Sequence, residues 1–280
     1  MSNRRSVIML TATPMPARED APLKREIYNF FDYFEFFKEI VKRDFKKKYY
    51  KSFLGIIWTI LNPLLMMVVI TIVFSTLFKR QIPYFPVYYL VGYIFLSFNN
   101  TATSQALNSI LSNNGLIKKI YVPQYIFPIS CVIIQLITLI LSIIPLVLVM
   151  LLIHVPFTPY ILLLPIPIFY VFLFSTGLSL ILSAYGTFLR DLTYLYGIIT
   201  LIWSYLTPIF YPIEIIPQAF RFLWNLNPLY IYVTIARTLV LDGRLPDPTL
   251  LIAGLCFSIL TLIAGAVIFR EKKKKFILYI

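Results

Sequence analysis

The chain has 280 residues, of which 59% are hydrophobic and 13% charged, whereas a soluble domain carries about 25% charged residues. This composition excludes a soluble protein and indicates one that lies mostly in lipid. The net charge of +13 does not indicate nucleic-acid binding, because the basic residues are segregated: twelve Lys and Arg precede residue 52 and five lie between 270 and 275.

Residues 1–22 contain three prolines and are expected to form a flexible cytoplasmic tail. Arg4 and Arg5, followed by a short apolar run, leave a cleaved signal peptide as an alternative. We disfavour it because cleavage would place the basic stretch before residue 52 outside the cell, against the positive-inside tendency.

Residues 23–51 are expected to form an amphipathic helix and a basic segment that enters the membrane. Apolar residues recur there at steps of three and four, while charged residues fill the other face. The helix would lie in the cytoplasmic interface with its apolar stripe in the headgroup region, either as an anchor or as a docking surface for a protein. The stripe includes Phe30, Phe34, Phe37, Val41 and Phe45.

Six stretches are apolar over the length of about 20 residues that a helix needs to cross a bilayer. They are residues 53–78, 87–111, 126–153, 161–188, 192–211 and 250–269. With the N terminus inside, 20 of the 25 Lys and Arg residues fall in cytoplasmic segments, so both termini are expected to be cytoplasmic. The expected fold class is an all-α integral membrane protein whose six-span domain covers residues 52–280.

The second span is apolar at its start and polar in its second half. Such polar groups do not face lipid: they hydrogen-bond to other helices or line an aqueous path, and the sequence leaves both alternatives open. The residues concerned are Asn99, Asn100, Thr101, Thr103, Ser104, Gln105 and Asn108.

Residues 212–248 are too apolar for a solvated loop and too interrupted to span the membrane. Pro217 and Pro228 each suit the first turn of a short helix, and Asn227 suits the N-cap of the second. We expect a re-entrant pair of half-helices that dips into the outer leaflet. A seventh span at 228–241 is rejected, because it would place the basic residues 272–275 outside.

The sequence lacks the residues that three kinds of function require. A proton-driven transporter needs a titratable side chain at membrane depth, but the only Asp, Glu, Lys or Arg residues between 81 and 189 are Lys118 and Lys119, in a cytoplasmic loop. An enzyme needs clustered acids, bases or nucleophiles, and the carboxylates after residue 190 are scattered. No P-loop is present, so another subunit must hydrolyse any ATP. His154 and the two cysteines are isolated, so no metal site is expected.

The residues that lead into the first span carry a resemblance to a known family. Residues 43–64 include Arg-Asp-Phe, Tyr-Tyr-Lys-Ser-Phe-Leu-Gly-Ile-Ile-Trp and Leu-Asn-Pro-Leu, in which Gly55 permits close helix approach, Trp58 anchors the interface and Pro63 kinks the span. Two later stretches, 188–212 and 227–237, match too. The chain resembles ABC-2-type polysaccharide exporter permeases, above all those that export O-antigen-type polysaccharide or wall teichoic acid on a polyprenyl diphosphate lipid.

The resemblance implies that the loop at about 113–123 is a coupling helix that docks into a groove on a separate ATPase subunit. The alternative is a solvated loop with two stop-transfer lysines. The candidate coupling residues are Asn114, Gly115, Leu116, Ile117, Lys118, Lys119, Ile120 and Tyr121.

Candidates for the substrate path are aromatic rings of the first and fifth spans and one cation near the cytoplasmic mouth. The rings could stack on sugars or simply pack against protein and lipid, and the cation could meet a diphosphate or pair with a carboxylate. The path candidates are Trp58, Phe74, Tyr194, Tyr196, Trp203, Tyr205, Phe210 and Arg190. The candidates for an outer gate within 212–248 are Pro212, Glu214, Pro217, Trp224 and Pro228.

The expected protein is half of the membrane pore of an ATP-driven exporter in the bacterial cytoplasmic membrane. Six helices alone would pack solid, so a second copy is expected to complete the path for a lipid-linked polymer. Two ATPase subunits would bind ATP and Mg²⁺, and this chain would bind no cofactor. The alternatives are a membrane enzyme acting on polyprenyl-linked glycans and a passive channel.

Overall fold

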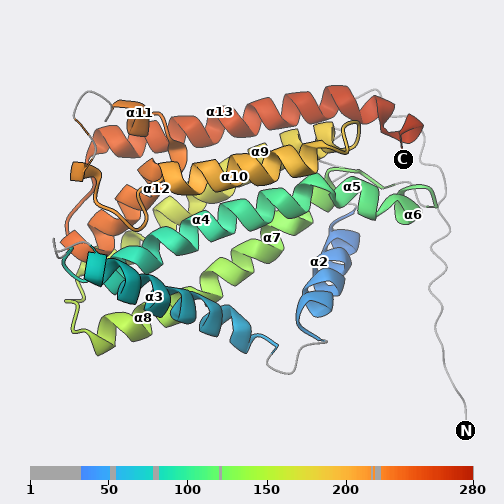
Figure 1. The fold of residues 1–280 in the computed structure, drawn as a ribbon. Helices are drawn as coiled ribbons and strands as arrows, with labels where there is room; N and C mark the ends of the chain where they lie inside the picture. Colours follow the sequence, from blue (N-terminus) through green and yellow to red (C-terminus); the bar gives the residue numbers. More distant parts are fainter. Residues whose placement is uncertain are drawn as a thin grey trace, which may run out of the picture.

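The structure, a computed structural model, describes residues 33–50, 55–77, 82–119, 122–215, 217 and 222–279. These residues are helical, without strands, and most of the long helices run along one axis while α2 stands across one end (Figure 1). The helices are α2 (Phe34–Tyr49), α3 (Ile57–Leu77), α4 (Phe85–Leu107), α5 (Ser109–Ser112), α6 (Asn114–Ile117), α7 (Ile126–Leu141), α8 (Ile143–Leu152), η1 (Pro159–Leu163), α9 (Pro165–Gly186), α10 (Leu192–Leu206), η2 (Ile213–Ile215), α11 (Phe222–Asn225), α12 (Pro228–Arg237), η4 (Thr238–Asp242), α13 (Pro248–Lys272) and η5 (Lys273–Leu278).

Helices occupy all six predicted spans, with shifted ends. Four helical stretches are long and apolar enough to cross a membrane: Ile57–Phe74, Ile126–Leu152, Pro159–Gly186 and Pro248–Phe276. The helix in the predicted fifth span, α10, has only 15 residues. It ends at Thr207, whose backbone is extended, because the following Pro208 disfavours helical geometry in the residue before it.

The predicted third span is broken in the middle. Helix α7 ends at Leu141 and α8 begins at Ile143. Pro145 accounts for the break, because its ring clashes with the carbonyl group four residues earlier, which is that of Leu141. Sequence periodicity gave no sign of this interruption, since both halves are equally apolar.

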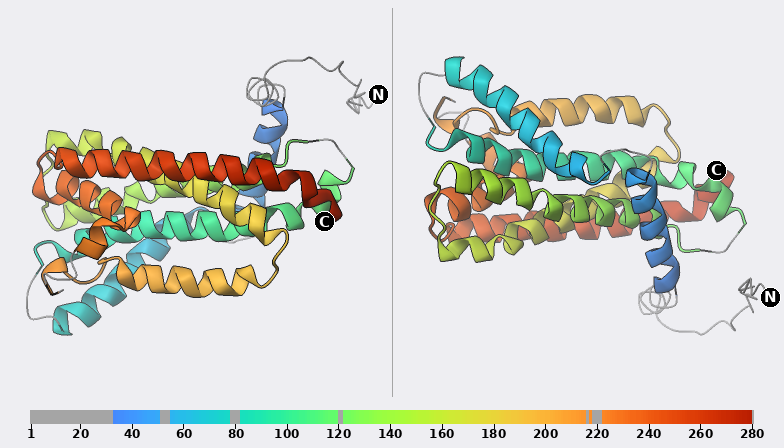
Figure 2. Two further views of the ribbon diagram at one scale, coloured as in Figure 1. Left: turned by 90° about the horizontal axis from the view of Figure 1, so that it is seen from above. Right: turned by 90° about the horizontal axis from the view of Figure 1, so that it is seen from below.

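Helix α4 is the least apolar of the predicted spans and the most enclosed, with α7, α9, α10 and α12 around it (Figure 2). Its polar side chains meet neighbouring helices. Asn99 is fully buried and accepts a hydrogen bond of 2.9 Å from the Ser175 hydroxyl, and Asn100 donates to Ser204 at 3.1 Å. Hydrogen bonding between helices therefore accounts for these two asparagines in the predicted polar half.

Helices α9 and α13 make the closest backbone approach in the bundle. A Cβ atom built on Gly177 would lie 2.3 Å from the carbonyl oxygen of Thr261, and one built on Gly265 would lie 2.3 Å from that of Gly177. Only residues without a side chain permit this contact. It fixes α13, most of whose other residues are not buried, to the centre of the bundle.

Helices α3 and α10 are the least embedded of the long helices. Both lie to the same side of α4 (Figure 2). Many of their large hydrophobic side chains are exposed. Tyr196 is the only residue of α10 that is buried. Their exposed residues are mainly aliphatic, so these faces require lipid or another protein surface.

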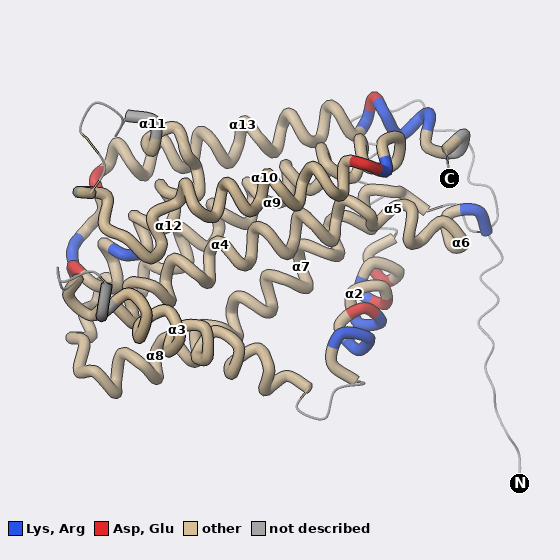
Figure 3. Tube along the Cα trace, in the orientation of Figure 1, with Lys and Arg blue, Asp and Glu red and all other residues tan. Residues whose placement is uncertain are grey.

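Charge is sorted along the bundle. Lys and Arg gather on α2, beyond α6 and at the end of α13, all at one end, whereas few charged residues occupy the other end (Figure 3). At that other end, Asp247 caps α13 by accepting hydrogen bonds from the Thr249 backbone N–H at 2.9 Å and hydroxyl at 2.8 Å. These bonds lower the pKa of the Asp247 carboxyl below its ordinary value.

Candidate coupling surface and substrate path

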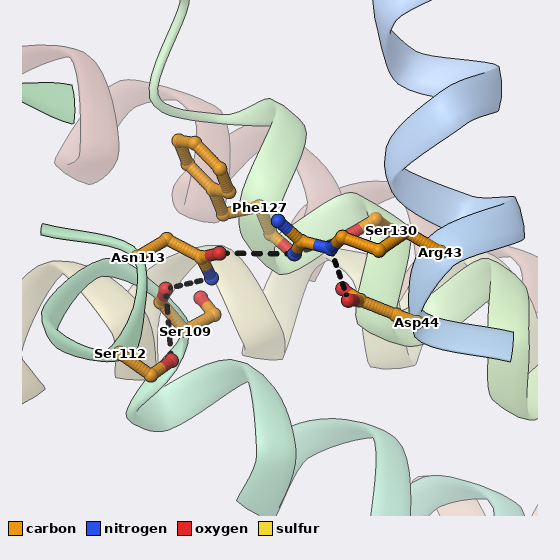
Figure 4. Close-up of polar contacts among 7 residues, drawn as sticks. All are labelled: Arg43, Asp44, Ser109, Ser112, Asn113, Phe127 and Ser130. Carbon is orange, nitrogen blue, oxygen red and sulfur yellow. Dashed lines mark hydrogen bonds and ion pairs between the residues drawn. The ribbon is translucent and has the colours of Figure 1, made fainter. Parts of the chain in front are cut away.

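Helix α2 is tied to the segment after α4 by side chains that are 70 residues apart (Figure 4). The Arg43 guanidinium donates from Nε to Asp44 Oδ1 at 2.7 Å and from Nη2 to Asn113 Oδ1 at 3.0 Å. Asn113 in turn donates to the carbonyl oxygen of Ser109 at 2.8 Å. A charge-assisted hydrogen bond therefore joins α2 to the residue that precedes α6.

The predicted coupling residues form a short turn followed by an exposed basic pair. Asn114 to Ile117 make up the single turn α6, which begins at the predicted residue but is shorter than the predicted segment 113–123. Lys118 and Lys119 follow it and are exposed, and Ile120 and Tyr121 lie outside the described residues.

One side of α6 is open and the other is anchored. A Cβ atom on Gly115 would meet no heavy atom within 4 Å, whereas Ile117 packs against a buried cluster that includes Phe269 and Phe276. Leu116 is partly buried. The turn thus presents its polar residues outward while its apolar residue joins it to α13 and η5.

The apolar stripe of α2 lies partly on the bundle. Phe37 is buried in a cluster with residues at the start of α7, whereas Phe34 is 41% exposed. Val41 and Phe45 are partly buried, and Phe30 lies outside the described residues. Part of the stripe that was predicted to face headgroups therefore packs against α7, and part of it is exposed.

A cavity of about 440 Å³, here called the polar cavity, lies where α2, α3, α4 and α7 meet. The Lys48 ammonium points to it and donates to Gln135 Oε1 at 3.0 Å and Thr138 Oγ1 at 2.8 Å. Trp58, a predicted path residue, adds an aromatic wall. The other polar lining residues are Tyr49, Thr59, Asn62, Tyr93, Ser97, Thr101 and Ser142. An aromatic ring, many hydroxyl and amide groups and one cation suit a sugar or a phosphate-bearing headgroup.

Two of the predicted path aromatics are packed within the bundle. Tyr196 is buried and donates to Thr103 Oγ1 at 2.7 Å, which joins α10 to α4. Trp203 donates from Nε1 to Asn227 Oδ1 at 2.8 Å, which joins α10 to α12. In this structure both side chains join α10 to neighbouring helices.

The remaining predicted path residues fall into an exposed group and a cluster. Tyr194 and Tyr205 are 78% and 62% exposed, respectively, on α10. Phe74 packs against Phe210, with ring centroids 5.1 Å apart, and Phe210 also contacts Tyr205. The structure thus does not bring the predicted rings together in one line. Arg190 is exposed, and no ion pair joins it to a carboxylate among the residues described.

A short helix lies where the second half-helix of the re-entrant pair was predicted. Helix α12 begins at Pro228, and the Asn227 side chain caps it by accepting from the backbone N–H groups of Leu229 and Tyr230. Trp224 donates from its indole to the carbonyl oxygen of Leu206. Before α12 the chain forms the short turns η2 and α11, with Pro212 before η2. Pro217 is exposed, and the side chain of Glu214 lies outside the described residues.

Arg237 was not among the predicted site residues, although it is the most enclosed cation of the described chain. It lies at the end of α12 and is 8% exposed. Its guanidinium donates to the carbonyl oxygens of Tyr88, Pro208 and Ile209 at 2.8–3.2 Å and lies 3.4 Å from the centroid of the Tyr88 ring. It thereby holds α12, α4 and the chain after α10 together. An Arg within an apolar stretch was the sequence signal for it.

Four helical stretches long and apolar enough to cross a membrane, packed around the more polar helix α4, are the arrangement of a polytopic membrane protein. The chain belongs to the ABC-2 type transporter family, whose sequence profile matches residues 35–241. This match runs from α2 to η4.

Three relatives cover almost the whole chain. The O-antigen export system permease protein RfbA of Myxococcus xanthus is 30% identical over 257 residues, which are 91% of this chain and 97% of that protein. Two proteins of the same name from Klebsiella pneumoniae are each 28% identical over 251 residues, which are 89% of this chain and 96% of each relative.

Proposed function

We propose that the chain is the transmembrane permease subunit of an ATP-driven exporter that moves a polyprenyl-diphosphate-linked O-antigen-type polysaccharide, or wall teichoic acid, across the bacterial cytoplasmic membrane. The observation that carries this proposal is the similarity to O-antigen export permeases over 91% of the chain and 97% of the relative. Such coverage includes α2, α6 and α12, so the proposal extends to the coupling surface as well as the spans.

The proposed topology has six spans, formed by α3, α4, α7 with α8, α9, α10 and α13. The concentration of Lys and Arg at the end that carries α2, α6 and η5 supports a cytoplasmic location for that end and both termini (Figure 3). In this arrangement α2 is the interface helix, and α11 with α12 forms the re-entrant pair and outer gate at the opposite face.

The proposed assembly contains two copies of the chain and two ATPase subunits. The exposed aliphatic faces of α3 and α10 support a second copy, because one protomer leaves them uncovered on the same side of α4. The turn α6 with Lys118 and Lys119 would dock on the ATPase, which would bind ATP and Mg²⁺. The bond from Asn113 to Arg43 would pass its movement to α2.

The polar cavity is the proposed first contact for the substrate. It lies beside α2, at the end of the bundle proposed to be cytoplasmic, and combines Trp58 with the Lys48 ammonium. A lipid-linked glycan offers both sugar hydroxyls and phosphate to such a wall.

The test is reconstitution of the chain with its ATPase subunit in proteoliposomes. ATP-dependent passage of a polyprenyl-diphosphate-linked glycan is expected. Passage without ATP would identify a passive channel, and alteration of the glycan without the ATPase would identify an enzyme. Replacing both Lys118 and Lys119 with Ala should weaken co-purification of the ATPase. The charge-matched control is Lys46→Ala with Lys47→Ala, on the exposed side of α2, and an equal effect of both pairs would contradict the docking assignment.

A further inference from the structure

A second cavity, of about 640 Å³, opens at the end of the bundle opposite α2. We call it the far-end cavity. Its wall is formed by the start of α4, the chain from Pro208 to Ile213, and α12 with η4. This region belongs neither to the coupling surface nor to the polar cavity.

Among the residues described, the lining of the far-end cavity holds two cations and one carboxylate. Arg237 and Arg244 both line it, and Asp242 is the acidic residue among the described lining residues. Asp242 pairs with Arg244 at 3.2 Å. Arg237 has no ion pair within the described chain. Its neighbours there include backbone carbonyl groups and the side chains of Tyr88 and Tyr230.

The guanidinium of Arg237 is not saturated by those carbonyl groups. Its Nε donates once and its Nη2 donates to two carbonyl oxygens, but its Nη1 donates only to Pro208. One of the five N–H groups of an arginine therefore remains available. Because burial weakens screening by water, a desolvated cation of this kind attracts an anion strongly.

Hydroxyl groups complete the donor set. Tyr84, Tyr230 and Thr234 line the same cavity, and their side-chain oxygens have no hydrogen-bond partner in the described part of the chain. Tyr84 also has a φ of 52°, in the left-handed region that a tyrosine rarely adopts. A backbone conformation that is this unfavourable in free energy persists only where the surrounding structure fixes it, and such residues often lie at ligand sites.

From this geometry we infer that the far-end cavity is a binding site for a phosphate-type oxyanion, held by Arg237, Arg244, Tyr230 and Thr234. Donors on two separate parts of the chain, α12 and Arg244 two residues after η4, favour a tetrahedral group with several acceptor oxygens over a single carboxylate. The phosphate could belong to a phospholipid headgroup or to a free phosphate compound. The inference stands on the cavity alone and does not require the proposed exporter function.

The experiment measures binding by the purified full-length chain in phosphate-free detergent. One arm titrates inorganic pyrophosphate, and the other titrates short-chain phosphatidylglycerol against the matching diacylglycerol, which lacks phosphate. Saturable binding is expected in at least one arm. Pyrophosphate binding identifies a free phosphate compound as the source, whereas binding of phosphatidylglycerol alone identifies a lipid headgroup.

Two variants locate the site. Tyr230→Phe removes one hydroxyl, and Arg244→Gln removes one exposed cation, so neither disturbs the buried Arg237. Each should weaken the observed binding about tenfold, as expected when a hydrogen bond to a charged group is lost. Tyr194→Phe and Lys119→Gln are the matched controls at exposed positions away from the cavity and should leave binding unchanged. The inference is overturned if neither probe binds saturably, or if both cavity variants bind the probe as strongly as the unchanged chain does.

Discussion

The side chains of Arg43 and Asn113 meet at 3.0 Å, although 70 residues separate them in sequence. Each belongs to an element with a proposed role at the cytoplasmic end, α2 for the membrane interface and α5–α6 for docking of the ATPase. The hydrogen bond joins these two elements. Asp44 also accepts from the Arg43 guanidinium, and the Ser109 carbonyl oxygen accepts from Asn113.

Breaking this bond should uncouple transport from ATP hydrolysis. Arg43→Ala and Asn113→Ala are each expected to lower glycan transport per ATP hydrolysed by about two- to tenfold, the range that corresponds to one net hydrogen bond. The double variant should be no worse than either single one, since both remove the same interaction. The measurement is transport and ATPase rate in the same proteoliposomes.

Lys42→Ala is the control for that experiment. Lys42 is the neighbour of Arg43 but pairs with Glu39 on the same helix, at 3.6 Å. Lys42→Ala should leave the amount of glycan transported per ATP hydrolysed unchanged. Fully additive losses from Arg43→Ala and Asn113→Ala would show that the two side chains act separately.

The approach of α9 to α13 predicts a stability effect. Gly265→Ala would place a methyl group 2.3 Å from the carbonyl oxygen of Gly177, which is backbone and cannot swing away. We expect a loss of about 1–3 kcal/mol, the usual cost of overpacking. The loss of stability is measured by heating the protein in detergent and monitoring how much of it stays monodisperse.

Gly197→Ala on α10 is the matched control, because an added Cβ atom there meets nothing within 4 Å. Alanine favours a helix over glycine, so this variant should be as stable as the original chain or more so. A Gly265→Ala protein that unfolds at the same temperature as Gly197→Ala would contradict the close contact.

The sequence predicted the helical class and the approximate positions of the apolar helices because apolar length is a local property. It also predicted the Asn227 cap of α12, which depends on neighbouring residues. It did not predict the burial of Tyr196 or the Arg43–Asn113 bond. Those depend on which faces of distant helices meet, and an aromatic residue on an apolar helix suits a lipid-facing, a path-lining or a packed position equally well.

Tyr196 should anchor α10. It is the buried residue of that helix, and its hydroxyl donates to Thr103 at 2.7 Å. Tyr196→Phe is expected to destabilise the protein by about 1 kcal/mol, because it leaves a buried hydroxyl without its donor. The measure is again thermal unfolding in detergent. Tyr194→Phe changes an exposed ring on the same helix and should have no effect, so equal shifts for both variants would rule out the anchoring role.

The Asn227 side chain has four hydrogen-bond partners, and two variants separate its acceptor bonds from its donor bond. Its Oδ1 caps α12 and accepts from Trp203 Nε1 at 2.8 Å, while its Nδ2 donates to Thr207 Oγ1 at 3.0 Å. Asn227→Ala should cost about 1–2 kcal/mol, since it removes the cap and leaves the indole unpaired.

Asn227→Asp keeps both acceptor roles and loses only the donor to Thr207, so it should retain most of the stability. If the proposed outer gate depends on α12 being joined to α10, Asn227→Ala should also change glycan transport, and Asn227→Asp should change it less. Equal transport by the two variants, with unequal thermal stability, would show that this junction supports the fold without taking part in gating.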